Sequence, residues 1–236
     1  MMRPAITSLL SLNAGYADTA GFMALHGLFT AHVTGNFVTI GAALAQGTSG
    51  VVTKLLALPT FCVAIVLARL LRYALIARGL PVLKTLLGVK LLLLTVVGAL
   101  AVRFGPFPSA DTLPAAVTGL TLVAGMAIQN ALQRVHLASA PPTTIMTGTT
   151  TQMMLDVADL LHGVAQESKD LTRARLQRMS RAVFIFALGC ALAALLYAVI
   201  DVWCFAVPPV LALGTYLHHE ANESVPTRAG SREKVP

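Results

Sequence analysis

The sequence has few charged residues. Lys and Arg number 17 and Asp and Glu 10, which is 11% of 236 residues, whereas a soluble domain carries about 25%. Hydrophobic residues make up 56% of the chain, and the mean hydropathy is +0.75. So few charges cannot cover a water-facing surface of this size, which argues against a soluble enzyme, a disordered chain and a nucleic-acid-binding domain. The net charge of +7 is instead typical of the basic loops of a membrane protein.

The sequence also lacks the motifs of soluble catalysis. It contains no G-x-S-x-G, Walker A, G-x-G-x-x-G or H-E-x-x-H pattern. The three cysteines, Cys62, Cys190 and Cys204, lie in or beside apolar stretches without C-x-x-C spacing, which is typical of small core side chains. We therefore expect no enzyme activity, no cofactor and no metal site.

Long apolar stretches dominate what is present. A membrane helix needs about 20 apolar residues, and a polar interruption from Asn13 to Asp18 argues that the first stretch is a membrane helix rather than a cleaved signal peptide. The long stretches occupy residues 5–28, 55–77, 83–102, 114–133, 182–200 and, more weakly because Pro208-Pro209 interrupts it, 203–217.

Two shorter apolar stretches occupy residues 36–46 and 149–161. Helices of that length span only about 17–20 Å, against a hydrocarbon core about 30 Å thick. Each follows an irregular polar segment, at 30–36 and 141–148. Irregular backbone at membrane depth occurs only inside protein or beside a water-filled cavity. The pattern therefore predicts two re-entrant half-helices.

Basic residues predict the orientation. Nine of the seventeen lie in segments 69–84 and 163–181, which the positive-inside rule places in the cytoplasm. Arg3 places the N-terminus on the same side, so an even number of crossings must separate it from segment 69–84, and likewise segment 69–84 from 163–181. Each interval contains two long stretches and one short stretch, so neither short stretch crosses and the chain has six crossings in all. If both cross, the chain has eight spans and an external N-terminus. Lys90 and Arg103 are expected to extend toward the two membrane faces.

The two halves of the chain resemble each other. In the first half, Ala14-Gly15 is followed by Thr34-Gly35, and in the second half Ala124-Gly125 is followed by Thr147-Gly148. The first half is expected to start inside the cell and the second half outside. We therefore expect an all-α polytopic membrane protein with six transmembrane helices, two re-entrant half-helices and an inverted 3+3 repeat. The predicted units are residues 1–104 for the first repeat, 105–217 for the second and 218–236 for a disordered cytoplasmic tail.

In this arrangement the N-termini of the half-helices meet near the midplane. Helix N-termini are partially positive, so the pair favours an anion or a polar solute. Thr34 and Thr147 supply hydroxyls, while Gly35 and Gly148 permit a close approach of another backbone. Asn36 either caps its half-helix or lines the path.

Several polar side chains interrupt the apolar stretches. A carboxylate within the membrane is costly and marks a functional site by default, so Asp18 is a candidate for proton or cation coupling or for pairing with a substrate amine. The alternative is an interfacial or helix-pairing role. Gln129 and Asn130, its approximate counterparts, either line the site or bond neighbouring helices. Thr30 is grouped with the path, whereas His32 is interpreted as structural.

A polar stripe follows the second Thr-Gly pair. Gln152, Asp156, Asp159 and His162 recur at helical spacing. The stripe either faces a hydrated path, which we favour for Asp156, or pairs with the basic loop expected to follow it, at 163–181.

The elements Ala14-Gly15-Tyr16-Ala17-Asp18 and Leu28-Phe29-Thr30-Ala31-His32-Val33-Thr34-Gly35-Asn36 resemble the N-terminal signature of the YoaK family. Gly125, Gln129-Asn130 and Thr147-Gly148 are similar to its second, weaker pattern. The resemblance covers nearly the whole chain and implies a multi-pass protein of the bacterial inner membrane. It implies no substrate.

The combined hypothesis is a transporter or channel for an unidentified small solute, embedded in the lipid bilayer and acting alone or as a homodimer. The runner-up is a non-transporting assembly partner or sensor whose polar motifs only pack helices, and a membrane enzyme comes third. The expected path residues are Asp18, Thr30, Thr34, Gly35, Asn36, Gln129, Asn130, Thr147, Gly148 and Asp156.

Overall fold

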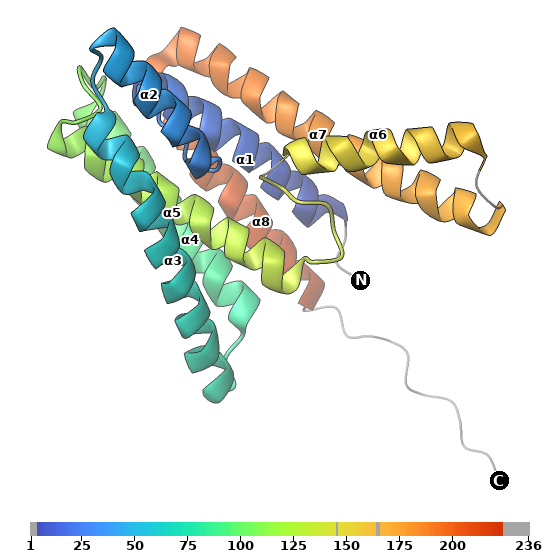
Figure 1. Ribbon diagram of the computed structural model, residues 1–236. Coiled ribbons are helices and arrows are strands. Elements are labelled where there is room, and N and C mark those ends of the chain that lie inside the picture. The colour runs from blue at the N-terminus through green and yellow to red at the C-terminus, as the bar shows by residue number, and fades with distance from the viewer. Residues whose placement is uncertain (1–3, 145, 164–165, 224–236) are drawn as a thin grey trace.

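The computed structural model describes residues 4–144, 146–163 and 166–223, and every regular element within them is a helix. Figure 1 shows their arrangement. The elements are α1 (Pro4–Ala24), η1 (Val33–Gly35), α2 (Asn36–Gln46), α3 (Val51–Ala77), α4 (Val82–Phe104), α5 (Leu113–His136), α6 (Met146–His162), α7 (Gln166–Ile200), η2 (Asp201–Ala206) and α8 (Val207–Glu223).

The two short stretches are separate helices, as expected. The first, α2, has the bounds that the apolar pattern indicates. The second, α6, begins earlier, at Met146. Thr147 and Gly148 therefore lie in the first turn of α6, and not in the irregular segment before it, while Thr34 and Gly35 lie in η1. The first expected helix is shorter than its apolar stretch, because α1 ends at Ala24.

Two other expectations are corrected at the C-terminal end. The basic segment 163–181 is not a loop, because most of it forms the first half of α7, where Lys, Arg, Gln and Leu are good helix formers. Pro208 and Pro209 do not break α8, since they occupy its first turn, where no intrahelical N–H is needed. Helix α8 continues to Glu223, and residues 224–236 lie outside the described residues.

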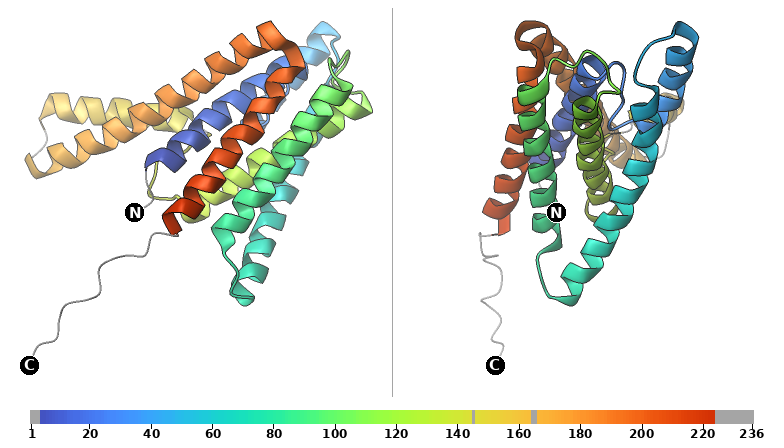
Figure 2. Two further views of the ribbon diagram at one scale, coloured as in Figure 1. Left: turned by 180° about the vertical axis from the view of Figure 1, so that it is seen from behind. Right: turned by 90° about the vertical axis from the view of Figure 1, so that its left-hand side faces the viewer.

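Four described segments are long and apolar enough to cross a membrane: Val51–Ala77, Val82–Phe104, Leu113–His136 and Ser168–Glu220. The last contains most of α7 and α8, which are joined by η2 and run away from it in roughly the same direction (Figure 2). Large apolar side chains remain exposed along α3 and α7, such as Leu67 and Phe184, which suits contact with lipid and not with water. The chain is therefore a helical membrane protein.

Helix α1 lies inside the bundle, packed against α7, α8 and α5. Its buried face is built from Ala14, Ala17 and Ala20, and such small side chains let helices approach closely. Its polar residues are also enclosed: Asn13 Nδ2 donates to Pro208 O at 3.2 Å and Tyr16 Oη donates to Cys204 O at 2.8 Å. Small apolar side chains and two hydrogen bonds thus hold α1 inside the bundle.

The remaining helices pair around α1. Helix α3 packs on α5, α4 packs on α5 and α8, α2 packs on α3, and α6 packs on α7. The start of α1, the turn between α3 and α4, and the end of α8 lie at the same end of the bundle (Figures 1 and 2). Helix α6 and the first half of α7 form a hairpin that extends away from the other helices (Figure 1).

Candidate functional site

The carboxylate of Asp18 is the centre of a hydrogen-bond network between α1 and the segment that enters α2. Asp18 is 5% exposed. Its Oδ1 accepts from the backbone N of Thr30 and of Ala31, each at 2.7 Å, and from Thr30 Oγ1 at 3.3 Å. On the other oxygen, Oδ2, His32 Nδ1 lies at 2.6 Å. The carboxylate thus replaces the backbone partners that an irregular segment lacks.

Asn36 closes the same segment from the other side. Its Oδ1 accepts from Phe29 N and its Nδ2 donates to Phe29 O, both at 2.8 Å. The ring of Phe29 lies over Gly35, where a Cβ would approach the ring carbon Cδ2 to 2.9 Å. Gly35 therefore permits a close approach, as expected, although the neighbour is an aromatic ring and not another backbone. Asn36 holds the segment and is itself buried.

A groove of about 420 Å³ opens beside this network. We call it the Asp18 groove. Within it the side chain of His32 is 31% exposed, against 6% for Asp18, so the histidine is the more accessible member of the pair. His32 also contacts the ring of Phe186 edge-on, at 5.7 Å between centroids. The groove is lined by Asp18, Thr19, Phe22, Phe29, His32, Gly35, Phe186 and Cys190.

The wall of the Asp18 groove depends on a close crossing of α1 and α7. A Cβ on Gly15 would overlap the carbonyl oxygen of Phe186, and one on Gly189 would overlap that of Leu12. Two glycines on facing helices therefore bring the backbones together. This crossing brings Phe186 and Cys190 of α7 beside Asp18 of α1.

In the second half of the chain, Gln129 of α5 binds three groups at once. Its Nε2 donates to Leu10 O at 2.9 Å and to Thr143 Oγ1 at 3.0 Å. Its Oε1 accepts from Lys90 Nζ at 2.5 Å. Lys90 is 1% exposed, so the expectation that it extends toward a membrane face is wrong. The amide oxygen of Gln129 provides its amine with a partner inside the bundle.

Asn130 lies one position further along α5 and also binds the segment before α6. Its Oδ1 accepts from Thr144 Oγ1 at 2.7 Å, and its Nδ2 donates to Met126 O at 3.0 Å. Gln129 and Asn130 thus hold residues 143 and 144 much as Asp18 holds residues 30 to 32. The interhelical hydrogen bonding that the sequence left open is present for Gln129, which binds α1 and α4, whereas Asn130 binds its own helix and the segment before α6.

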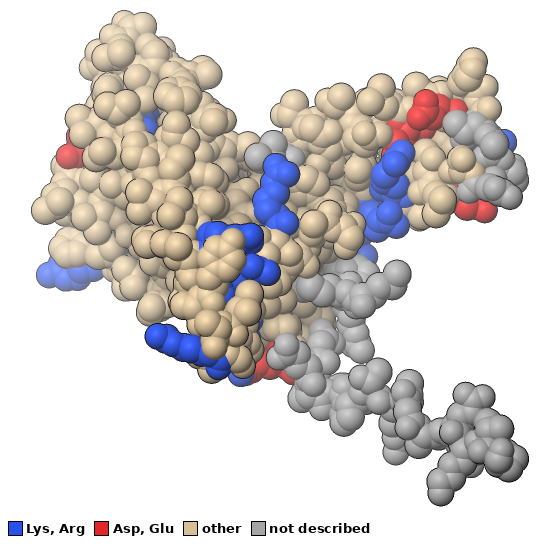
Figure 3. All heavy atoms as spheres, turned by 60° about the horizontal axis from the view of Figure 1, so that its bottom comes forward, with Lys and Arg blue, Asp and Glu red and all other residues tan. Residues whose placement is uncertain are grey.

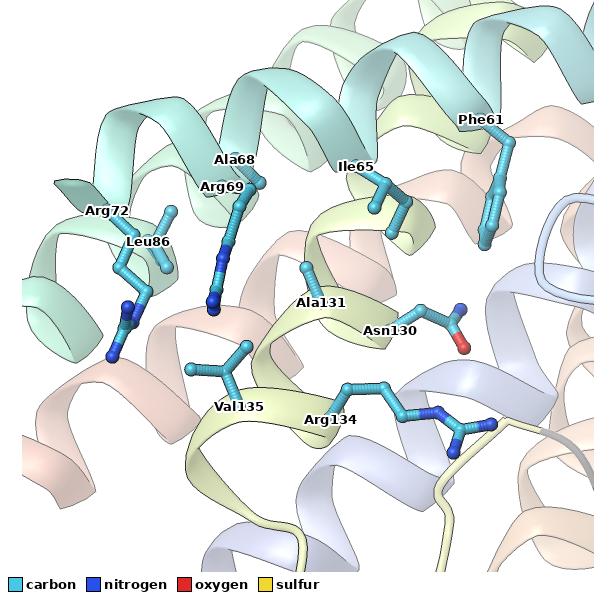
Figure 4. A pocket seen from close by; sticks show the side chains of 10 residues that line it. All are labelled: Phe61, Ile65, Ala68, Arg69, Arg72, Leu86, Asn130, Ala131, Arg134 and Val135. Atoms are coloured by element: carbon cyan, nitrogen blue, oxygen red, sulfur yellow. The ribbon is translucent and has the colours of Figure 1, made fainter.

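Asn130 also faces a second cavity, of about 360 Å³, between α3, α4 and α5. Figure 4 shows its lining side chains, among which are three arginines. We call it the arginine pocket. It is lined by Phe61, Ile65, Ala68, Arg69, Arg72, Leu86, Asn130, Ala131, Arg134 and Val135.

Asp156 adopts the second of the two roles that the polar stripe allows. It is fully buried, and Arg175 of α7 donates to it through Nε at 2.8 Å and through Nη2 at 2.5 Å. Gln152 Nε2 adds a bond at 2.8 Å. This two-pronged pair joins α6 to the basic first half of α7.

The remaining expected path residues lie at the surface. Thr34 is exposed, as are Thr147 and Gly148. Gly35 lines the Asp18 groove, whereas Thr147 lines a shallow hollow on α6 with Thr150 and Thr151. In Figure 1 the N-terminal ends of α2 and α6 both point toward the middle of the molecule, and their C-terminal ends point to opposite sides.

Within the residues that the structure describes, no three His, Cys, Asp or Glu side chains group as metal ligands. Cys62, Cys190 and Cys204 are free thiols, exposed, half-buried and buried respectively. Exposed Cys62 departs from the expectation that all three are core side chains.

A family model described as "Protein of unknown function (DUF1275)" matches residues 6–218. The chain belongs to the DUF1275 family. The match covers α1 to most of α8, and so contains both the Asp18 groove and the arginine pocket. No curated protein and no solved structure matches the chain. The resemblance to the YoaK family remains a prediction from the sequence motifs.

In this DUF1275 family member, the structure adds residues to these sites that the sequence did not indicate as site residues. His32 and Phe29 lie beside Asp18, and Lys90 binds Gln129. Lys90 carried a signal, since a basic residue in the middle of an apolar stretch is expensive in a membrane. Arg69 and Arg134 carried none, because their meeting depends on the packing of α3 against α5.

Proposed function

We propose that this DUF1275 family member is a membrane transporter or channel for a small solute, and that the solute contacts the Asp18 groove. The observation that carries the proposal is the pair formed by the buried carboxylate of Asp18 and the partly exposed ring of His32, which together line a groove between α1 and α7. Ionisable groups within membrane helices are costly and are retained mainly at solute and proton pathways.

The geometry supports a proton-coupled mechanism. An ionised carboxylate only accepts hydrogen bonds, so His32 donates to it through Nδ1. A weakly acidic or polar solute that enters the groove would meet this hydrogen-bonded acid and imidazole beside the segment that leads into α2.

The contact pattern supports the inverted repeat. If α1 to α4 correspond to α5 to α8, the pairing of α1 with α7 corresponds to that of α5 with α3, and the pairing of α4 with α5 to that of α8 with α1. The Asp18 groove, between α1 and α7, then corresponds to the arginine pocket, between α5 and α3. We propose six crossings, by α1, α3, α4, α5, α7 and α8, with α2 and α6 re-entrant.

The test is solute flux and proton movement in proteoliposomes, screened over small anions, cations and neutral solutes. Asp18→Asn keeps an oxygen that accepts from the amides of Thr30 and Ala31, but removes the charge. His32→Asn removes the imidazole that binds Asp18 Oδ2. His26→Asn is the matched control, because His26 lies in the same connecting segment and binds Phe107 O instead of lining the groove. Loss of proton-coupled flux in the first two variants, with the control unchanged, supports the proposal.

The alternative is a non-transporting protein in which these groups only hold helices and loops in place. The hydrogen bonds that Asp18 accepts from Thr30, Ala31 and His32 favour this alternative, because they hold the segment before α2 in place. In that case Asp18→Asn lowers the Tm but no solute moves in the wild-type protein. If the wild-type protein moves a solute and a variant with an unchanged Tm does not, the result supports transport.

We further propose that the basic end of the bundle faces the cytoplasm of a bacterial inner membrane, as the positive-inside rule and the family resemblance imply. An N-terminal tag and Arg78→Cys, in the turn after α3, are then labelled from the same side, and Thr48→Cys from the other. Opposite labelling of the tag and residue 78 contradicts six crossings. A homodimer would cover the apolar side chains exposed on the hairpin of α6 and α7, which include Leu155, Leu161 and Leu171.

A further inference from the structure

The arginine pocket combines three guanidinium groups with apolar walls. Arg69 and Arg72 extend from α3 toward α5, and Arg134 extends from α5 below Asn130 in the view of Figure 4. The ion pairs of the described residues involve Asp18, Glu220 and Asp156 and none of these arginines. Three positive charges around one cavity, without a carboxylate to neutralise them, favour an anionic ligand.

The geometry of the three arginines leaves donors free for such a ligand. Arg69 Nε donates to Tyr73 Oη at 2.9 Å, and its guanidinium lies over that ring at 4.8 Å from the centroid. Arg72 Nε is buried and has no hydrogen-bond partner within the described part of the chain. A guanidinium held against a ring and one with an unmet donor are both suited to bind phosphate oxygens.

The position of the pocket selects the kind of anion. On α3 the lining runs from Phe61 to Arg72, which is roughly 16 Å at 1.5 Å per residue. The apolar side chains Phe61 and Ile65 lie toward the membrane interior, and the arginines lie toward the end of the bundle where basic side chains gather (Figure 3). This order, charged at the membrane surface and apolar beneath, matches a phospholipid with its phosphate outward and its acyl chain inward.

We propose that the arginine pocket binds an anionic phospholipid of the leaflet at this end of the bundle. The phosphate lies against Arg69 and Arg72 of α3, Arg134 adds positive charge from α5 on the far side of Val135, and one acyl chain lies against Phe61 and Ile65. The lipid thereby bridges α3 and α5. This assignment does not depend on transport, because its readout is lipid binding.

The test measures lipids retained by the purified full chain in native mass spectrometry, with phosphatidylglycerol and phosphatidylcholine supplied in equal amounts. The test variant replaces Arg69, Arg72 and Arg134 together by Gln. Each basic residue near an anionic lipid surface strengthens binding roughly fivefold, so the preference for phosphatidylglycerol is expected to fall roughly a hundredfold.

The control replaces Arg173, Arg178 and Arg181 of α7 together by Gln. These side chains are all exposed and lie outside the pocket, and the net charge changes by the same three units. The control is expected to keep the wild-type preference. An equal loss in both triple variants, or no loss in the test variant, overturns the proposal, because binding would then follow total charge or other residues.

Two further arms keep the test decisive. If the triple Gln variant does not fold, Arg69→Gln and Arg134→Gln are measured singly, and each is expected to reduce the preference roughly fivefold. Inorganic phosphate and glycerol phosphate at millimolar concentration are added to the wild type. Displacement of the lipid by either soluble anion assigns the pocket to a soluble phosphate and overturns the lipid assignment, while retention of the lipid supports it.

Discussion

The crossing of α1 and α7 positions the Asp18 groove and can be tested with a single methyl group. In Gly15→Ala the new Cβ overlaps the carbonyl oxygen of Phe186. Because that obstacle is the backbone of α7, no side-chain rotation relieves it and the two helices must separate. Overpacking of this kind costs about 1–3 kcal/mol. For a chain of this length each kcal/mol lowers the Tm by about 2–4 °C, so a fall of roughly 2–12 °C is expected.

Gly41→Ala is the matched control. Gly41 lies within α2, and its added Cβ meets no heavy atom within 4 Å. Since alanine is favoured over glycine in helix interiors by about 0.5–1 kcal/mol, this variant is expected to keep or raise the Tm. Both variants are measured by thermal unfolding in one detergent, so the change in composition is the same and only the location of the methyl group differs.

The facing glycine provides a consistency check. Gly189→Ala overlaps the carbonyl oxygen of Leu12 at the same crossing and is expected to behave like Gly15→Ala. The double variant is expected to lose less than the sum of the two, because one separation of the helices relieves both overlaps. Equal Tm values for Gly15→Ala and Gly41→Ala would refute the crossing and, with it, the placement of α7 beside Asp18.

Three further predictions concern buried polar contacts and are checked by thermal unfolding. Gln129→Leu leaves the amine of Lys90 inside the bundle without this acceptor and is expected to cost about 3 kcal/mol or more, whereas Lys90→Met leaves only a neutral amide oxygen unpaired and is expected to cost less, about 1–3 kcal/mol; the reverse order contradicts this role of the pair. Arg175→Ala and Asp156→Ala are expected to show a coupling of about 0.5–3 kcal/mol in a double-mutant cycle, and additive losses speak against the pair. Partial burial alone would raise the pKa of Asp111, but backbone amides at the start of α3 and a nearby lysine lower it. The stability that Asp111 contributes is therefore full above the ordinary aspartate pKa and lost as pH falls through the lowered one, so Asp111→Ala is expected to cost stability at pH 7 and progressively less in acid; a loss that is constant with pH would contradict the assignment.

The positions of most helices followed from local pattern, because apolar runs and the length a membrane requires are properties of neighbouring residues. Helix α2 has the predicted bounds for that reason. The basic segment after residue 163 was interpreted as a loop, yet Lys and Arg are good helix formers, and Arg175 is bound by Asp156 across the hairpin. Charge indicates where a segment meets water, and not whether it is helical.

The sequence identified candidate residues by the energetic cost of a charged side chain within the membrane, but only the fold identified the groups that they bind. An aspartate in an apolar stretch is expensive wherever it lies, so Asp18 was recognisable from the sequence alone. That its carboxylate binds Thr30, Ala31 and His32 depends on α1 ending at Ala24 and the chain turning back. Likewise Lys90 finds its acceptor 39 residues away, on α5.

Composition, hydropathy and charge thus determined by themselves that this chain is a helical membrane protein with two short helices and costly polar residues, because each of these is a sum over nearby positions. Only the tertiary structure decided which polar groups meet. The Asp18 groove joins α1 to α7, and the arginine pocket joins α3 to α5. Contacts between segments so distant in the chain depend on how helices cross, which is set by small residues such as Gly15 and Gly189 and leaves no periodic signal in the sequence.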